Sequence, residues 1–449
     1  MRRAVLTLFA VLAPAAAYAH ASEGGFVLLL PTDLYVAGGA VVVGLTVVFL
    51  AVAPNWHPNR LFRAYIHLPS LGARALPVTQ TLSLILLVLL IVSGFTGATD
   101  PLRNPLILGL WTVFWITLVG VQAVVFDIWR WINPFAALSR LTSIFPTPLN
   151  HHRPNRWISV ALFLAFSGFL LADPAPSDPR RLAAFATAYL VVTTFALTLF
   201  GPRWLVRAEF LSALMRLYRQ TAIAAPHGPA RALGPNGWRI LRLGVPALPT
   251  AIFILILLGS GSFDGLNETF WWLGLLGVNP LEFPGRSAVI APTLAGLLVV
   301  NVTLILAYAL CIALGLRLIG SDQSLRHAIC LFAPSILPIA AGYHVAHYLT
   351  SFLVDSQHVV SLISSTLGFG ERAVTTGFFN RLDTVRLIWL SQAGAVVLGH
   401  VVAIVVAHGI ALRAYQDPRR ATLSQLPLAF FMIAYTVFGL WLLAAPKGA

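Results

Sequence analysis

Four histidines lie in two consecutive apolar segments near the C-terminus of the chain. His344 and His347 are three positions apart in the first segment, and His400 and His408 follow in the second. Ionisable side chains at membrane depth are costly, so they usually face a site, a partner or a water-filled cavity. We therefore consider three roles for these imidazoles: binding a metal or a haem, relaying protons, or forming hydrogen bonds between helices.

The spacing of His344 and His347 places both rings on one face of a helix, where they can converge on one ion. His400 of the next, antiparallel segment is the expected third ligand across the helix pair. A zinc, copper or iron ion held in this way would acidify a bound water. His408 is eight residues deeper, about 12 Å along the axis, and is a candidate for a second cofactor site, a proton relay or a hydrogen-bond donor in helix packing.

Two carboxylates and one further histidine could assist such a site. Asp355 follows His344 by eleven residues, which returns it to nearly the same helix face about 16 Å along the axis. Asp264 ends an earlier apolar segment on the same predicted side of the membrane. Either carboxylate could orient a ligand or accept a proton as a catalytic group. His20 would become N-terminal after cleavage at Ala19, and its amine and ring together can chelate a metal.

The composition indicates a polytopic membrane protein. Of the 449 residues, 58% are hydrophobic and 10% are charged, and the mean hydropathy is +0.84. Soluble domains average about 25% charged residues. The net charge of +14 comes from arginines in short loops between apolar segments, which indicates membrane orientation rather than nucleic-acid binding. Cys311 and Cys330 form no C-x-x-C pattern and are interpreted as small apolar residues.

We expect an all-α fold of about ten transmembrane helices that follow a cleavable signal peptide. Residues 1–19 have the basic start, apolar stretch and Ala17-Tyr18-Ala19 cleavage site of such a peptide, which leaves 20–449 as one helical domain. Windows of about 20 apolar residues predict the spans. They are 30–53, 78–98, 106–126, 157–173, 182–201, 244–262, 288–316, 327–354, 386–413 and 426–445.

The distribution of charge predicts the orientation in a bacterial inner membrane. Nineteen basic residues fall in one set of loops and eight in the other set and the C-terminal tail, so the first set is predicted to be cytoplasmic and both mature termini periplasmic. Eleven of the fifteen acidic residues fall on the periplasmic side. The chain has no Walker A motif and no G-x-S-x-G motif, so neither ATP-driven transport by this chain alone nor α/β-type serine-hydrolase chemistry is favoured.

Several motifs resemble those of the fenitrothion hydrolases, a family of organophosphate-hydrolysing bacterial integral membrane proteins. The strongest are Tyr343-His344-Val345-Ala346-His347-Tyr348-Leu349, Gly399-His400 with Ala407-His408, and Ser424 to Pro427 with Tyr435-Thr436 and Leu440-Trp441. The matching pieces are spread over nearly the whole length, and the others are Ala19-His20 with Leu30 to Tyr35, Asp127 to Pro134, Phe200 to Trp204 with Glu209 and Phe210, and Phe263-Asp264-Gly265. The chain departs from the family at 355–358, where a glycine is expected before Gln357.

The resemblance implies hydrolysis of lipophilic organophosphate triesters and brings no assigned catalytic residues. Combined with the histidine cluster, it leads to the hypothesis of a metal-dependent hydrolase in the lipid bilayer, with His344, His347 and His400 as ligands. The alternative hypothesis is a membrane protein that handles a metal or a haem, in copper uptake or electron transfer, with incidental hydrolysis or none. There His20 and the acidic outer face would capture the ion.

Overall fold

Apolar helices build the fold, and the expectation of an all-α polytopic bundle is confirmed. The computed structural model describes residues 27, 29–53, 58–62, 65–68, 73–146, 149, 152–227, 230–283 and 285–447. The helices that correspond to the predicted spans are α3 (Thr32–Val52), α5 (Leu76–Thr96), α6 (Pro105–Ile107) with η3 (Leu108–Leu118) and α7 (Val119–Val124), α10 (Trp157–Ala172), α11 (Pro179–Phe200), α14 (Leu248–Leu266), η6 (Arg286–Val289) with α16 (Ile290–Leu318), α17 (Leu325–Phe332) with η7 (Ala333–Ile336) and α18 (Leu337–Thr366), α19 (Leu382–Ala414) and α20 (Pro418–Ala444).

Nine of these helices in the described chain are long and apolar enough to cross a membrane. The tenth, α10, has 16 residues and therefore spans only about 24 Å. The predicted signal peptide lies outside the described residues.

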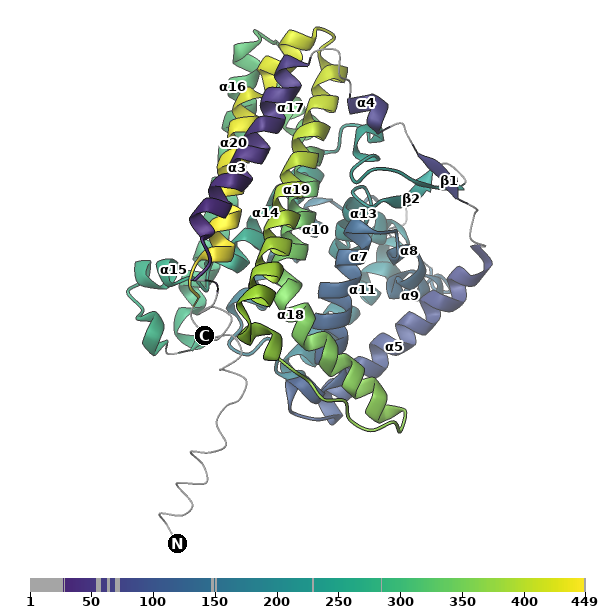
Figure 1. The fold of residues 1–449 in the computed structure, drawn as a ribbon. Helices are drawn as coiled ribbons and strands as arrows, with labels where there is room; N and C mark the ends of the chain where they lie inside the picture. Colours follow the sequence, from purple (N-terminus) through teal and green to yellow (C-terminus); the bar gives the residue numbers. More distant parts are fainter. Residues whose placement is uncertain are drawn as a thin grey trace.

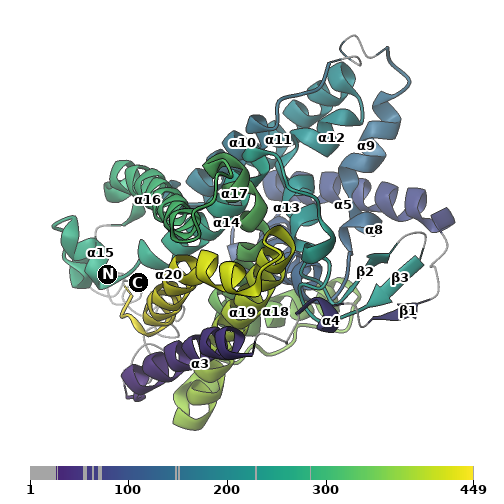
Figure 2. The same ribbon diagram turned by 90° about the horizontal axis from the view of Figure 1, so that it is seen from above.

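The helices form two groups with α14 and α18 between them. Figure 1 shows α3, α16, α19 and α20 running side by side in one group, and α5, α9 (Pro134–Thr142) and α11 packing together in the other. Figure 2 shows the same separation from above. The start of α3 and the end of α20 lie at the same end of the bundle (Figure 1).

Burial separates the inner helices from the lipid-facing ones. Within their most apolar windows, 78% of the α17–α18 segment, 67% of α14 and 61% of α19 are buried, against 11% of α3. In a bilayer the apolar side chains of the outer helices face lipid, so burial inside the protein marks the helices that can enclose a site. The site is therefore expected on α14, α18 or α19.

Polar caps fix where several helices begin. The side chain of Asp178 accepts from the main-chain N–H of Arg181, and Pro179 occupies the first position of α11. Glu209 caps α13 (Phe210–Tyr218) by accepting from the N–H groups of Leu211 and Ser212. Such caps satisfy N–H groups that have no partner within the helix.

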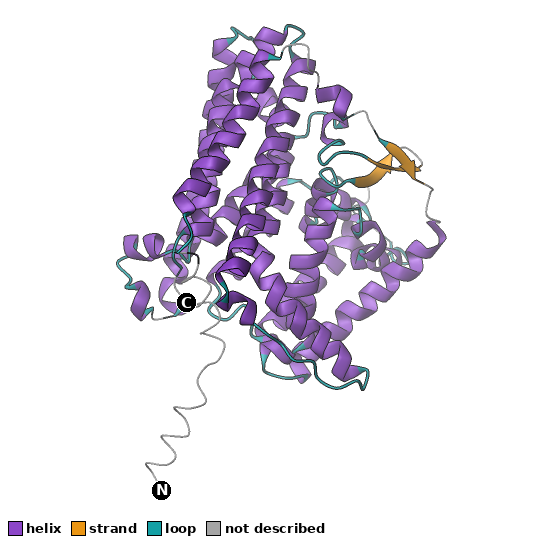
Figure 3. Ribbon diagram, viewed as in Figure 1, coloured by secondary structure: helices purple, strands orange, loops and turns teal. Residues whose placement is uncertain are grey.

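Two features of the structure differ from the sequence-based expectation. Strands β1 (Ile66–Leu68), β2 (Ala224–His227) and β3 (Ala230–Leu233) form an antiparallel sheet in the order β1-β3-β2, shown in orange in Figure 3. Sequence analysis missed them because strands this short lack a readable alternation. The predicted span 327–354 is also too short, because α18 continues to Thr366.

Candidate functional site

A small cavity lies among the inner helices at the level of His344 and His347. It offers about 40 Å³ in which the centre of a water molecule can lie, enough for about three waters. Both histidines line it, together with Asp264 at the last turn of α14. The remaining lining residues are Trp115, Phe163, Phe166, Ser167, Leu170, Leu171, Tyr218, Leu257, Leu258, Ser260, Gly261, Ala340, Tyr343 and Tyr348.

Asp264 and His347 form a carboxylate–imidazole pair across α14 and α18. Oδ2 of Asp264 lies 3.0 Å from Nε2 of His347, and the side chains are only 15% and 12% exposed. The same oxygen accepts the hydroxyl hydrogen of Tyr348 at 2.8 Å. With the carboxylate ionised, Nε2 of His347 carries the donated hydrogen and Nδ1 keeps the lone pair of the ring. The pair therefore defines which nitrogen of His347 can accept a proton.

Trp115 connects the second histidine to this pair. Its indole Nε1 donates to the Tyr348 hydroxyl at 2.9 Å, and its main-chain oxygen lies 3.0 Å from Nε2 of His344. A carbonyl oxygen only accepts, so His344 donates from Nε2. Trp115 belongs to η3, which is wound as a π-helix, and Thr117 Oγ1 bonds to the main-chain oxygen of Thr112. Such wide turns are rare and are often found at functional sites.

Small residues on α14 allow α18 to come close enough for these contacts. A Cβ on Gly265 would lie 2.1 Å from the Tyr343 hydroxyl oxygen, and one on Gly261 would lie 3.5 Å from Cδ1 of the same ring. The Tyr343 ring stacks on His347 with centroids 5.6 Å apart and an interplanar angle of 14°. Glycines four apart let two membrane helices approach closely. This pattern, Gly-x-x-x-Gly around Asp264, therefore sets the position of the His347 ring.

Four of the aromatic residues at the site were missed as functional residues by sequence analysis. Tyr348 and Tyr343 flank the histidines in the quoted motif, so their presence in that motif was the available signal. Trp115 lies in another apolar segment and carries no local signal, because its role depends on the packing of η3 against α18. Tyr218, at the end of α13, donates to the main-chain oxygen of Ala340 at 3.4 Å.

The structure does not bring His400 or His408 to the cavity. His400 is 1% exposed, and its Nδ1 donates to the main-chain oxygen of Val396 at 2.8 Å. Its Nε2 is buried and has no hydrogen-bond partner among the described residues. His408 lies further along α19, where its Nδ1 is 3.2 Å from the Gln425 amide nitrogen. Gln425 lies on α20, so this hydrogen bond joins two packed helices.

Of the two remaining predicted site residues, the structure describes Asp355 but not His20. Asp355 is not among the residues that line the cavity, and it lies inside α18 because that helix continues beyond the predicted end. The amino-terminal residue expected after cleavage, His20, lies outside the described residues.

The donor set at the cavity does not fit the expected three-ligand metal centre. His344 and His347 line the cavity, but His400, the expected third ligand, does not. In the part of the chain that the structure describes, no group of three or more His, Cys, Asp or Glu side chains could hold an ion. A haem does not fit the cavity either, because pockets that enclose a ligand of such size take roughly 300 Å³ or more. The cavity offers about 40 Å³.

Comparisons of the chain with protein-family models, with curated proteins and with solved structures find no match. Its function is therefore inferred from the geometry of the site and from the motifs of the sequence.

Proposed function

We propose that the chain is a membrane-embedded hydrolase of lipophilic organophosphate triesters, with His347 as the general base. The observation that carries the proposal is the hydrogen bond between Asp264 and His347 at the wall of a water-sized cavity. A carboxylate that fixes the tautomer and orientation of an imidazole is a recurrent arrangement for activating a nucleophile. The resemblance of the Tyr343–Leu349 motif to fenitrothion hydrolases supports the same substrate class.

In the proposed reaction His347 deprotonates a water in the cavity. The water oxygen forms a bond to phosphorus while its proton moves to Nδ1 of His347, and Asp264 stabilises the resulting imidazolium. The bond from phosphorus to the aryl oxygen breaks, and a nitrophenolate leaves with the electron pair. A nitrophenolate is a stable anion, so the reaction needs little help from a general acid.

The walls of the cavity suit an apolar substrate but restrict its size. Phe163, Phe166, Leu170 and Leu171 line one side, and all four are buried or half-buried. A cavity for about three waters accepts the attacking water and the phosphoryl oxygen or thiophosphoryl sulfur of the substrate. The aryl group therefore has to displace lining side chains, and the bilayer supplies a substrate that partitions into it.

We further propose that the protein lies in the bacterial inner membrane with both mature ends in the periplasm. The start of α3 and the end of α20 lie at the same end of the bundle as the C-terminal end of α14, the helix that carries Asp264 in its last turn. The predicted cytoplasmic loops carry most of the arginines. An alkaline phosphatase fused after Lys447 should be active and a green fluorescent protein there should be dark. The opposite pattern would reverse the orientation.

Hydrolysis of fenitrothion by the full-length protein in nanodiscs tests the function. Release of the nitrophenolate is followed for the wild type, His347→Gln and Asp264→Asn, with metal content measured on the same samples. We expect a loss of about 10²- to 10⁴-fold in kcat for His347→Gln, the usual contribution of a positioned acid–base group. Incubation with EDTA should leave the rate unchanged.

His327→Ala is the matched control, because His327 is exposed on α17, outside the cavity lining. It should hydrolyse fenitrothion at the wild-type rate. A wild-type protein that binds a stoichiometric metal or haem and hydrolyses nothing would overturn the proposal in favour of metal handling. Hydrolysis that disappears with EDTA and returns with added metal would restore the metal-dependent mechanism.

A further inference from the structure

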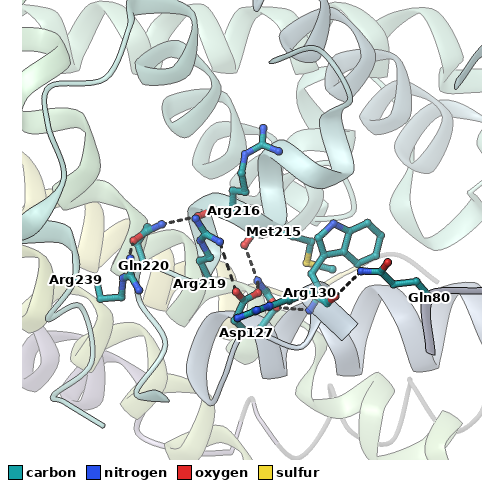
Figure 4. A network of polar contacts seen from close by, with 10 residues as sticks. Gln80, Asp127, Arg130, Met215, Arg216, Arg219, Gln220 and Arg239 are labelled. Carbon is teal, nitrogen blue, oxygen red and sulfur yellow. Dashed lines mark hydrogen bonds and ion pairs between the residues drawn. The ribbon is translucent and has the colours of Figure 1, made fainter. Parts of the chain in front are cut away.

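Two arginines lie near each other where the chain leaves α13. Figure 4 shows Arg219 and Arg239 on either side of Gln220, with Asp127 beside Arg219. We call Arg219 and Arg239 the arginine pair. Arg216, also shown, donates to the main-chain oxygens of Leu205 and Val206. Its guanidinium points away from the arginine pair in Figure 4.

Rigid parts of the fold hold both arginines in place. Arg219 follows the last residue of α13. Thr221, two residues after Arg219, donates from its hydroxyl to the main-chain oxygen of Ala123 at 2.6 Å. Arg239 follows Trp238, which is fully buried and donates from Nε1 to the main-chain oxygen of Ile223 at 3.1 Å. The two guanidinium groups are therefore held near each other by the packing of the chain.

The contacts of the arginine pair leave buried donors unused. Nη1 of Arg219 is 3.5 Å from Oδ2 of Asp127, and Nε of Arg239 donates to Gln220 Oε1 at 3.2 Å. Nε of Arg219 and Nη1 of Arg239 are buried and have no hydrogen-bond partner within the described residues. Buried donors are nearly always paired with an acceptor. Oδ2 of Asp127 is a buried acceptor that also has no hydrogen-bond partner in the described residues, so it can match one of the two donors and leaves the other without an acceptor.

The surrounding charge indicates that the acceptor is an anion. Residues 203–242 contain seven arginines and one acid, Glu209, whose carboxylate is occupied by capping α13 and by the hydroxyl of Tyr189. Burial lowers the pKa of Arg239, and the positive charge of Arg219 lowers it further. Asp127 is the one acid drawn in the network of Figure 4. Two guanidinium groups are thus balanced by one carboxylate.

We propose that the arginine pair, Arg219 and Arg239, binds the phosphate group of an anionic ligand. Guanidinium forks match phosphate oxygens geometrically, and one third of the Arg219 side chain is exposed, which gives the ligand access. Large apolar side chains are exposed nearby along the chain at Ile223 (41%), Leu243 (38%) and Val245 (45%). Basic pockets beside such apolar surfaces bind anionic lipid headgroups, and inorganic phosphate has the same recognition chemistry.

The proposal is tested on full-length protein purified in a non-ionic detergent. Native mass spectrometry measures retention of phosphatidylglycerol against phosphatidylcholine, and a thermal-shift titration measures stabilisation by inorganic phosphate. We expect preferential retention of phosphatidylglycerol, and affinity that falls roughly fivefold for each arginine replaced. Stabilisation by phosphate without lipid preference would identify free phosphate as the ligand, and the reverse result would identify the lipid.

The decisive variants are Arg239→Gln, which leaves the contact of Arg219 with Asp127 intact, and Arg219→Gln/Arg239→Gln. Arg317→Gln/Arg326→Gln is the control, because it removes the same charge from exposed positions on α16 and α17. Losses in the double variant no larger than in the control would overturn the proposal. So would a wild type that responds to neither ligand, since water would then be the acceptor. The site does not depend on the proposed hydrolysis.

Discussion

Oδ2 of Asp264 lies 3.0 Å from Nε2 of His347, although the two residues come from α14 and α18. The same carboxylate oxygen also accepts from Tyr348, the neighbour of His347 in sequence. Tyr348 in turn accepts from the Trp115 indole. One carboxylate therefore fixes the orientation of an imidazole and a phenol, and an indole from a third segment supports that phenol.

Tyr348→Phe should slow hydrolysis without weakening substrate binding. The substitution removes a second donor to Oδ2 of Asp264, the oxygen that His347 also contacts, so the carboxylate can rotate. Groups that orient a functional residue typically contribute 10- to 100-fold. We expect kcat for fenitrothion to fall by at least about tenfold with KM nearly unchanged. Tyr415→Phe, which loses a hydroxyl bonded to Gln323, is the control. A raised KM with normal kcat would contradict a positioning role.

Leu170→Ala should widen the range of triesters that are hydrolysed. Leu170 lines the cavity and is half-buried, so its truncation enlarges a small space at a moderate cost in stability. We expect kcat/KM to rise several-fold for diethyl and dipropyl triesters and to change little for dimethyl ones. Leu298→Ala, which truncates an exposed leucine of α16, should leave the ratio of kcat/KM for diethyl triesters to kcat/KM for dimethyl triesters unchanged. The same ratio in wild type and Leu170→Ala would place the substrate elsewhere.

Gly342→Ala and Gly399→Ala should destabilise the contact between α18 and α19. A Cβ on Gly342 would lie 2.5 Å from the main-chain oxygen of Ala395, and one on Gly399 would lie 2.6 Å from that of Pro338. Main-chain atoms cannot move aside cheaply, so we expect about 1–3 kcal/mol of destabilisation for each. Gly394 lies on α19, as Gly399 does, and a Cβ there would meet no atom within 4 Å. Gly394→Ala should therefore be neutral or slightly stabilising. Thermal unfolding in detergent compares the three glycine variants. Equal melting temperatures would contradict the close contact between α18 and α19.

Acidification should remove the stabilising effect of Asp173. Its carboxylate accepts from Nε and Nη2 of Arg181 at 2.9 and 2.7 Å, and this hydrogen bonding lowers the pKa of Asp173. A lowered pKa in the folded state means that the contribution is present above the unfolded pKa of about 3.9 and is lost as pH falls through the folded value. Asp173→Asn should therefore melt below the wild type at pH 6, with the difference shrinking toward pH 3. The exposed Asp322→Asn should show no such convergence.

The sequence alone determined the membrane bundle and the region of its site. Apolar length is a local property, so the spans could be located without knowing how they pack. The three-residue spacing of His344 and His347 put both on one helix face, and both line the cavity. Asp264 was expected on the same side of the membrane as these histidines and lies in contact with His347.

The tertiary structure decided which polar groups meet. Membrane helices are apolar on most sides, so hydropathy does not specify how far each helix is rotated about its axis. That rotation directs His400 away from the cavity and toward the main chain of its own helix. It also brings Trp115 to His344 and Tyr348 through a π-helical turn. The close approach of α14 and α18 at Gly261 and Gly265 then places Asp264 against His347, because only helices without intervening side chains can come so near.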